Sequence, residues 1–521
     1  MAVGKNILEN LTVGMYENSF TVFREYIQNA ADSIDKAIRI GLISEDDAVI
    51  DINIEYSKRT ITIYDNACGI PMHEFEKKMT DVADSDKDRD TEKGFRGIGR
   101  LAGLGYCAKL IFRTSAPGED KASTITWDGE KLKEIVDDPS QHPTSDECIK
   151  EITKVEIGNS PAKKEEHFFE VIMQDVIFES DDLLDVDRVK SYLCAVAPSP
   201  YLNHFTFTRK IHDFAKDNGF KIDEYRIIIN GSQIFKPYRT ILYEGSGDLK
   251  KRYDEVKDIQ FRIFKDKHGA PIAWMWFGIT KYEKNIPVIN EMRCIRLRKE
   301  NIQIGDENTI GCPKFFKEPR GNGYFIGELF AVDKNLIPNA RRDYFNPNPA
   351  AKQFEEELHD FFYDELHGLY YYASKVRSAQ KQVAAYQQKE EEFQEKETNG
   401  GFIDSDEREV AEKELEEDRA RAEKAEKEIA NRKKDTENNE VLKRVFDEIE
   451  KAYKRPESPK SQQEKNTEGG KKKQKYLTQG LSKLPTKDQK LVARIYGIIK
   501  NILPKDMAEL VILKIQEELS K

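Results

Sequence analysis

The sequence predicts an α+β protein in which two mixed α/β domains precede a helical region and a small helical C-terminal domain. Residues 24–36 combine polar and apolar positions at helical spacing, and residues 61–64 alternate as a strand does. Strand-like stretches and polar turns then alternate from about residue 181 to residue 345. From about residue 374 to residue 454 the chain is dense in Glu, Lys, Gln and Ala, which is typical of a coiled coil.

The expected domain boundaries follow these changes in composition. Prolines, a glycine pair and a lysine cluster before residue 475 are typical of a linker, and apolar residues at helical spacing follow it. The expected parts are a first domain over 1–180, a second over 181–350, a helical and coiled-coil region over 351–455, a linker over 456–475 and a helical domain over 476–521.

The first candidate motif is a pair of polar residues one helical turn apart, Glu25 and Asn29, with Asp32 and Lys36 on or beside the same stripe. Metal-assisted ATP hydrolysis needs a carboxylate that orients and deprotonates water, and a neutral oxygen ligand for Mg²⁺. Glu25 and Asn29 suit these two roles. Taken alone, the pattern is more often the solvated side of an amphipathic helix.

The second motif follows the strand of residues 61–64. Asp65 stands at the strand end, where a carboxylate can accept the exocyclic amine of adenine, and Gly69 allows a tight turn beyond it. Taken alone, this motif is most often only a turn.

The third motif is a glycine-spaced loop with Gly94, Gly97 and Gly99, whose backbone N–H groups could cradle phosphates. A dinucleotide-binding fingerprint is excluded because residues 85–93 before it are charged and lack an apolar strand. The order of the three motifs within about one hundred residues favours an ATP site.

With these motifs the chain resembles the GHKL ATPases, the superfamily of gyrase B, MutL, HtpG-type heat-shock chaperones, histidine kinases and MORC proteins. The resemblance covers most of the first 350 residues. It implies a Bergerat-type ATP-binding α/β sandwich followed by an S5-like transducer domain, with ATP and Mg²⁺ as ligands. Under this resemblance Glu25 is the general base and Asn29 is the magnesium ligand.

The resemblance also implies the other nucleotide-binding residues. Asp65 matches the adenine-reading aspartate, Asp32 and Lys36 match the chaperone-like pattern, and Lys87 belongs to a lid element of MORC-like members. The expected set is completed by Gly69, Ile70, Gly94, Phe95, Arg96, Gly97, Ile98 and Gly99.

Two positions depart from the family pattern. Ala67 replaces the first glycine of the Asp-x-Gly-x-Gly motif, a tolerable change if the backbone there has a negative φ. No Gly-Thr pair precedes the candidate strand of residues 168–173, so no threonine is assigned to adenine.

Residues 336–343 resemble the chaperone loop whose arginine reaches back to the γ-phosphate. Arg342 aligns with that arginine, and Arg341 is its rival. A guanidinium fork suits phosphate oxygens, although an arginine pair could instead cap the following helix or form a surface ion pair. The basic stretch 295–305 could touch nucleic acid, but an exposed hairpin is the preferred interpretation.

Composition bounds the partners and the compartment. The 521 residues include 84 Lys and Arg against 95 Asp and Glu, a net charge of -11, which weighs against a surface that binds DNA throughout while allowing local basic patches. Six scattered cysteines indicate reduced thiols of a cytoplasmic protein. The N-terminus has no apolar signal core and no segment is long and apolar enough to span a bilayer, so no membrane partner is expected.

The sequence therefore favours an ATP-gated clamp that dimerises when its lid, residues 80–99, closes, with the N-terminal segment 7–16 contributing to the homodimer. A MORC-like or heat-shock-like ATPase within a multi-protein system, such as antiviral defence or DNA surveillance, is the preferred class. The coiled coil, with a hairpin turn at residues 399–401, and the C-terminal helices would bind protein partners. The alternatives are a protein-folding chaperone and a coiled-coil scaffold with a nucleotide-sensing head.

Overall fold

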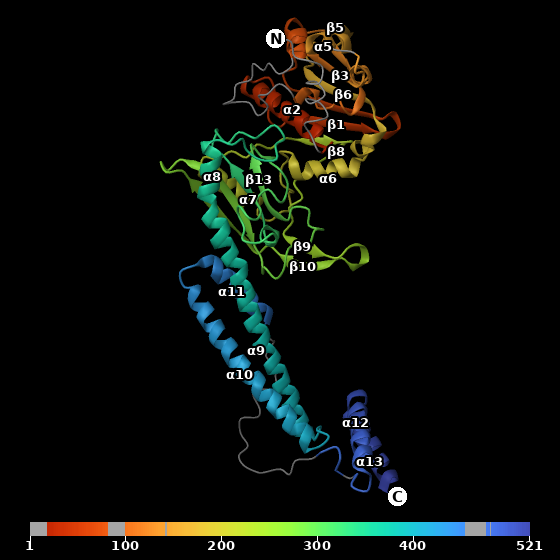
Figure 1. Ribbon diagram of the computed structural model, residues 1–521, viewed down its shortest axis with the longest axis vertical. Coiled ribbons are helices and arrows are strands. Elements are labelled where there is room, and N and C mark those ends of the chain that lie inside the picture. The colour runs from red at the N-terminus through yellow and green to blue at the C-terminus, as the bar shows by residue number, and fades with distance from the viewer. Residues whose placement is uncertain (1–17, 82–98, 141–142, 454–475, 480, 521) are drawn as a thin grey trace. The chain divides into compact units, whose positions relative to one another are not determined.

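The computed structural model describes residues 18–81, 99–140, 143–453, 476–479 and 481–520 (Figure 1). Two compact units make up the chain. The first contains the residues up to Thr280 together with Lys284–His367, and the second contains Lys281–Glu283 and the residues from Gly368 onward.

The first unit begins with an eight-stranded, largely antiparallel sheet of strand order β5-β4-β3-β6-β2-β1-β7-β8. Only β1 and β7 pair in parallel among its described strands. The strands are β1 (Ile50–Glu55), β2 (Thr60–Asp65), β3 (Cys107–Ser115), β4 (Lys121–Asp128), β5 (Thr153–Pro161), β6 (Phe168–Val176), β7 (Ile227–Ile229) and β8 (Ser232–Gln233).

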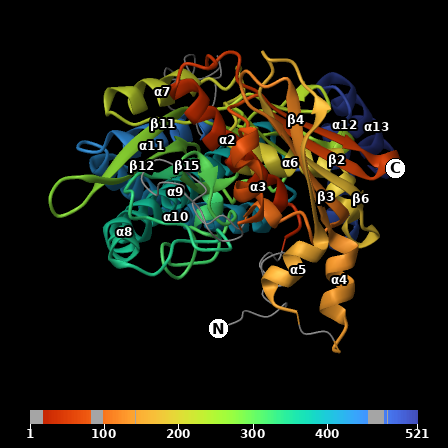
Figure 2. The same ribbon diagram turned by 90° about the horizontal axis from the view of Figure 1, so that it is seen from above.

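Helices cover one face of this sheet. Alternation along β2 turns Ile61, Ile63 and Asp65 toward the buried side, where helix α2 packs against β2 and buries Phe23 and Ile27. Figure 2 shows α2 and α3 on the same side of β3 and β4. The helices of this part are α2 (Thr21–Arg39), α3 (Met72–Thr80), α4 (Gly129–Asp137), α5 (Ser145–Ile152) and α6 (Val186–Val196).

A second sheet of strand order β11-β12-β15-β13-β14 follows, with a separate β9–β10 ribbon. Its core is aromatic: Trp274 stacks on Phe330, and Trp276 packs edge-on against Tyr238. The elements are α7 (Thr208–Asp217), β9 (Ile241–Glu244), β10 (Lys251–Glu255), β11 (Asp258–Lys265), β12 (Pro271–Ile279), β13 (Cys294–Lys299), β14 (Ile302–Gln303), β15 (Ile326–Ala331) and α8 (Pro349–Asp360).

A fully buried carboxylate, Glu328 on β15, holds this second domain together. Arg298 of β13 and Lys236 both form ion pairs with it, the latter with Lys236 Nζ 3.1 Å from Glu328 Oε1. Trp276 Nε1 also donates to Glu328 Oε2 at 3.3 Å. Burial raises the pKa of the Glu328 carboxyl, but the two cations outweigh this effect and hold it below its ordinary value.

This network corrects the expectation of an exposed basic hairpin at residues 295–305. The hairpin forms, as β13 and β14, but it is buried: Arg298 has no exposed surface and Arg296 is 4 % exposed. Arg298 also donates to the carbonyl of Ala195 at 2.8 Å. The Arg298 guanidinium is paired with Glu328 inside the domain. It is therefore not available to bind nucleic acid.

The second unit is helical. Gly400, with a φ of 62°, lies between α9 and α10, and Lys389 of α9 pairs with Asp418 of α10 at 2.5 Å. The hairpin expected at residues 399–401 is therefore confirmed, and the C-terminal pair of helices is also present. The helices are α9 (His367–Asn399), α10 (Ser405–Asp435), α11 (Glu440–Tyr453), α12 (Thr486–Ile502) and α13 (Lys505–Ser520).

The α+β class with further sheets and C-terminal helices is thus as the sequence predicts. All six cysteines are free thiols, four of them buried. Within the described ranges, none of the helices has the length and apolar character needed to cross a bilayer.

The Glu328 network makes a prediction about stability. Glu328→Gln leaves Arg298 and Lys236 buried without a counter-charge, so the free energy of unfolding should fall by about 3–5 kcal/mol. The matched control is Glu55→Gln, which breaks the exposed Lys58–Glu55 pair and should cost under about 1 kcal/mol. Urea unfolding monitored by tryptophan fluorescence measures both, and equal effects would contradict the role given to Glu328.

Candidate functional site

Helix α2 carries all four polar residues of the first predicted motif. Its apolar side is buried in the core, and Asn18 Oδ1 accepts the Phe20 N–H just before the helix begins. Glu25 and Asp32 are 8 % and 5 % exposed, Asn29 is partly buried, and Lys36 is exposed near the end of the helix. Glu25 and Asp32 therefore do not lie on the solvated side of an amphipathic helix, the alternative that the pattern alone allows.

Asp65 ends β2 and is buried, 4 % exposed. The Ala67 N–H donates to Asp65 Oδ1 at 3.1 Å. Burial raises the pKa of Asp65 from 3.8 to about 7, an effect that this hydrogen bond only partly opposes. A buried carboxylate so weakly compensated is typical of a site that accepts a further donor.

The loop after Asp65 approaches the neighbouring strand closely. Gly69 has a φ of 62°, and a Cβ there would lie 2.0 Å from the Ser115 carbonyl oxygen, so only glycine fits. The Ile70 N–H donates to Thr114 Oγ1 at 2.9 Å. Ala67 does not have a positive φ, so alanine is tolerated at this departure from the family pattern.

This loop also contacts helix α2. Cys68 Sγ donates to the Ser33 carbonyl oxygen at 3.7 Å. Burial raises the pKa of the Cys68 thiol, and the nearby charge of Lys36 opposes that effect. The loop after Asp65 therefore lies beside the second half of helix α2.

The sheet register places a phenylalanine, and not a threonine, directly beside the candidate adenine-binding residue Asp65. Asp65 pairs directly with Phe169 of β6, and Phe169 pairs with Thr114 of β3, so the three side chains share one face of the sheet. Phe169 is the immediate neighbour of Asp65. The Thr114 hydroxyl donates to the Phe168 carbonyl at 2.7 Å and supports the loop through Ile70.

Sequence reasoning missed Thr114 because its role depends on strand pairing, for which the sequence offers no local signal. The same holds for Tyr26, whose hydroxyl donates to the Arg100 carbonyl at 3.1 Å and accepts the Gly103 N–H at 2.9 Å. These bonds fix the short 3₁₀ segment Gly99–Leu101 against α2.

Gly99 lies directly against the candidate base. A Cβ at Gly99 would stand 2.4 Å from Glu25 Oε2. Gly99, the last glycine of the third motif, thus contacts Glu25 of the first motif. The remaining residues of that motif and its lid, Lys87, Gly94, Phe95, Arg96, Gly97 and Ile98, lie outside the described residues, as does the segment 7–16.

The second domain contributes an arginine to the same place. Arg342 Nε lies 2.9 Å from Glu25 Oε1, and both side chains are largely buried. Arg341 is exposed, and its carbonyl accepts from Arg24 Nη2 at 3.2 Å. Helix α8 is capped by Asn348, whose Oδ1 accepts the Ala351 N–H. Of the two arginines, Arg342 is therefore the one that faces the candidate base.

The raised pKa of Asp65 predicts a stability effect in the nucleotide-free protein. A shift from 3.8 to about 7 corresponds to on the order of 4 kcal/mol. Because the folded state binds this proton more tightly, stability falls as pH rises from about 4 to 7. Asp65→Asn should therefore stabilise the protein by roughly 1–3 kcal/mol at pH 8, and the gain should vanish near pH 4.

Thermal unfolding at several pH values measures this effect. Asp51→Asn, an exposed residue on the neighbouring strand β1, is the matched control and should change little. A loss of stability in Asp65→Asn at pH 8 would show that the buried carboxylate is not the strained group described above.

Known proteins match the region that carries this geometry. The family model described as histidine kinase-, DNA gyrase B-, and HSP90-like ATPase matches residues 16–159. The chaperone protein HtpG of Clostridium perfringens is 30 % identical over 144 residues, which are 25 % of this chain and 23 % of that protein.

Two further relatives have the same name. The chaperone protein HtpG of Francisella tularensis subsp. novicida is 29 % identical over 131 residues, 22 % of this chain and 21 % of that protein. The HtpG of Helicobacter hepaticus is 25 % identical over 180 residues, 31 % of this chain and 28 % of that protein.

The chain thus spans about a quarter of the length of the curated relatives it matches. Residues 16–159, which include Glu25 and Asp65, match the GHKL-type ATPase domain model, and the chain is distantly similar to HtpG.

Proposed function

We propose that this protein is a Mg²⁺-dependent ATPase whose nucleotide state controls the conformation of its two α/β domains. The observation that carries the proposal is the contact between Glu25 of the ATPase domain and Arg342 of the second domain. A candidate general base and a candidate phosphate-binding arginine, 317 positions apart in sequence, meet where Gly99 closes on helix α2.

The adenine end of the site is Asp65. Its buried carboxylate accepts the Ala67 N–H, and it has the acceptor capacity for the exocyclic amine of adenine as well. Gly69 and Ile70 shape the loop that closes over the base, because the backbone at Gly69 touches the Ser115 carbonyl and Ile70 is anchored to Thr114. Phe169 would contribute an apolar surface beside the base.

The metal end of the site is Asn29. Mg²⁺ is generally bound by one or two protein oxygens together with substrate phosphates and waters, and the amide of Asn29, one turn from Glu25 on α2, fits that requirement. When bound, the ion would neutralise charge on the triphosphate. Asp32 and Lys36 are further candidate contacts on the same helix.

Arg342 and Glu25 would act one after the other during ATP binding and hydrolysis. The guanidinium of Arg342 pairs with the Glu25 carboxylate and occupies one of its oxygens. A γ-phosphate is a second anion that suits the same guanidinium fork. Transfer of Arg342 to the phosphate would free Glu25 to orient and deprotonate water, and it would report the bound triphosphate to the second domain.

This mechanism suits an ATP-gated, dimerising clamp of the MORC-like or heat-shock-like type. Such a clamp would work in the cytoplasm within a multi-protein system such as antiviral defence or DNA surveillance. The described helices α9–α13 offer surfaces for protein partners. The similarity to HtpG supports the main alternative, a protein-folding chaperone. A nucleotide-sensing scaffold is the remaining alternative. Client refolding and ATP-dependent DNA retention assays distinguish the three classes.

The proposed base is tested by Glu25→Gln, which keeps the size of the side chain and removes its basicity. ATP hydrolysis should fall by roughly 10²–10⁴-fold, while the ATP dissociation constant stays within about threefold. Steady-state phosphate release and isothermal titration calorimetry measure the two quantities. Glu45→Gln, an exposed residue beyond α2, is the control. Undiminished hydrolysis in Glu25→Gln would remove the base and with it the proposed function.

The adenine contact predicts a pH dependence of ATP affinity. The ionised carboxylate of Asp65 is the stronger acceptor for the base amine, and its pKa is about 7. Affinity should therefore fall up to about tenfold per pH unit below 7 and stay constant above about 8. Saturating Mg²⁺ keeps the triphosphate ionised over this range.

Calorimetry in buffers of different ionisation enthalpy measures the linked proton, and up to one proton should be released at pH 6. Asp51→Asn should match the parent, and Asp65→Asn should not bind. An affinity that is flat between pH 6 and pH 8 would contradict the assignment of Asp65.

A further inference from the structure

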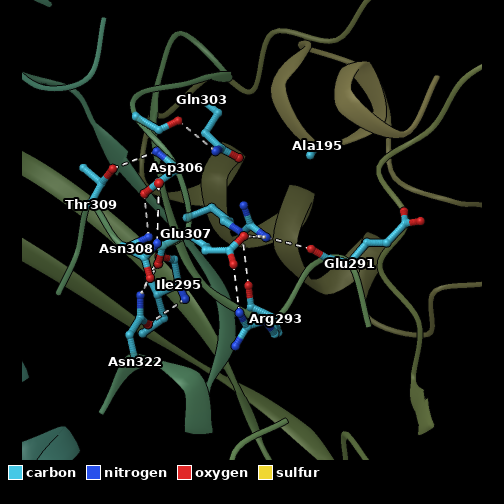
Figure 3. Close-up of polar contacts among 12 residues, drawn as sticks. Ala195, Glu291, Arg293, Ile295, Gln303, Asp306, Glu307, Asn308, Thr309 and Asn322 are labelled. Carbon is cyan, nitrogen blue, oxygen red and sulfur yellow. Dashed lines mark hydrogen bonds and ion pairs between the residues drawn. The ribbon is translucent and has the colours of Figure 1, made fainter. Parts of the chain in front are cut away.

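The segment after β14 is clamped by charged side chains from the β13 end of the second sheet. Glu307 pairs with Arg293 Nη2 at 2.8 Å and with Arg296 Nη2 at 3.4 Å, and Asn322 Nδ2 donates to the Glu307 carbonyl at 3.1 Å (Figure 3). Arg296 is buried, whereas the side chains of Arg293 and Glu307 are 21 % and 33 % exposed, so this anchor is partly buried.

The segment itself is folded into a tight turn. Gln303 Nε2 donates to the Gly305 carbonyl at 3.1 Å, the Asp306 N–H donates to Thr309 Oγ1 at 2.8 Å, and the Asn308 N–H donates to Asp306 Oδ1 at 2.7 Å (Figure 3). These bonds fix the direction of the Gly305 peptide. We name residues 305–309 the support loop.

The support loop contacts the loop that carries Arg342. The Gly305 N–H donates to the Arg342 carbonyl at 2.8 Å. Gly305 has a φ of 64°, and a Cβ there would lie 2.0 Å from Thr309 Oγ1 and 2.6 Å from the Asp343 carbonyl oxygen. A glycine is therefore required both for the backbone conformation and for the close approach.

Arg342 occupies a conformation that arginine rarely adopts. Its φ is 56°, in the left-handed region, and such a conformation persists only where the surroundings hold it. The Arg342 N–H donates to the Asn339 carbonyl at 3.1 Å, and its carbonyl accepts from Gly305. Both peptide groups of Arg342 are thus fixed while its side chain extends to Glu25.

We propose that Gly305 is a positioning residue for ATP hydrolysis, because its N–H group and its lack of a side chain hold Arg342 in the left-handed conformation that aims the guanidinium at the catalytic centre. This inference rests on the function proposed above. It adds that a residue of the support loop sets the conformation of Arg342. Gly305 itself touches neither Glu25 nor nucleotide. It acts through Arg342.

The test is a double-mutant cycle with Gly305→Ala and Arg342→Ala in the full chain. Gly305→Ala should lower kcat by roughly ten- to a hundredfold, as expected for a displaced catalytic group, with ATP affinity within about twofold of the parent. In the Arg342→Ala background the same substitution should change kcat by less than about twofold, because residues that act through one group are not additive.

The matched control is Gly269→Ala. Gly269 also has a positive φ, 85°, but a Cβ there meets no atom within 4 Å, so this variant includes the backbone strain without the clash and should keep the parental kcat. Thr309→Ala provides a milder second variant. It removes the acceptor of the Asp306 N–H, and it should lower kcat less than Gly305→Ala while obeying the same cycle.

An equal loss of kcat from Gly305→Ala with and without Arg342 would overturn the positioning role, and so would a loss confined to ATP affinity. If Gly305→Ala fails to fold, the Thr309→Ala cycle decides by the same criterion. Failure of the proposed function looks different, because Glu25→Gln would then hydrolyse ATP like the parent.

Discussion

The ion pair between Glu25 and Arg342 is the interaction on which the functional account depends. It joins a helix of the first sheet to a loop of the second domain, at a point where the backbone of Gly99 leaves no room for a larger residue. Both side chains are largely buried, and Arg24 Nε also lies 3.9 Å from Glu25 Oε1, so Arg342 is the nearer of two cations beside this carboxylate. Under the proposed function, a phosphate anion that competes for the Arg342 guanidinium would shift the relation between the two domains.

Two buried carboxylates illustrate opposite uses of the same chemical group. Glu328 is surrounded by Arg298, Lys236 and Trp276 and keeps its charge, so it stabilises the second sheet. Asp65 has one backbone donor, and its pKa is about 7. The first site is complete without a ligand, whereas the second gains a hydrogen bond when a donor enters. This contrast, more than burial alone, supports a structural role for Glu328 and the proposed ligand-binding role of Asp65.

Local patterns in the sequence predicted much of the fold and marked several residues of the candidate site. Helical spacing identified the helix of Glu25, alternation identified the strand that ends at Asp65, and the glycine pair at residues 400–401 marked the turn between two long helices. The α+β class with a GHKL-type ATPase domain was predictable because these patterns depend on residues close together in the chain.

Contacts between residues that are far apart in the chain could not be predicted from the sequence. The basic stretch 295–305 seemed exposed because its charge was visible and its partner, Glu328 on another strand, was not. Phe169 lies beside Asp65 only through the register of β2 and β6. The contacts of Thr114, Tyr26 and Gly305 likewise arise from segments brought together by folding.

The most direct test of the central claim is a crystal structure of the full chain with Mg²⁺ and a non-hydrolysable ATP analogue. We expect the adenine base on Asp65, the metal at Asn29, the guanidinium of Arg342 on the γ-phosphate, and Glu25 released from Arg342 and facing a water. An analogue bound at another surface, with the Glu25–Arg342 pair unchanged, would contradict it.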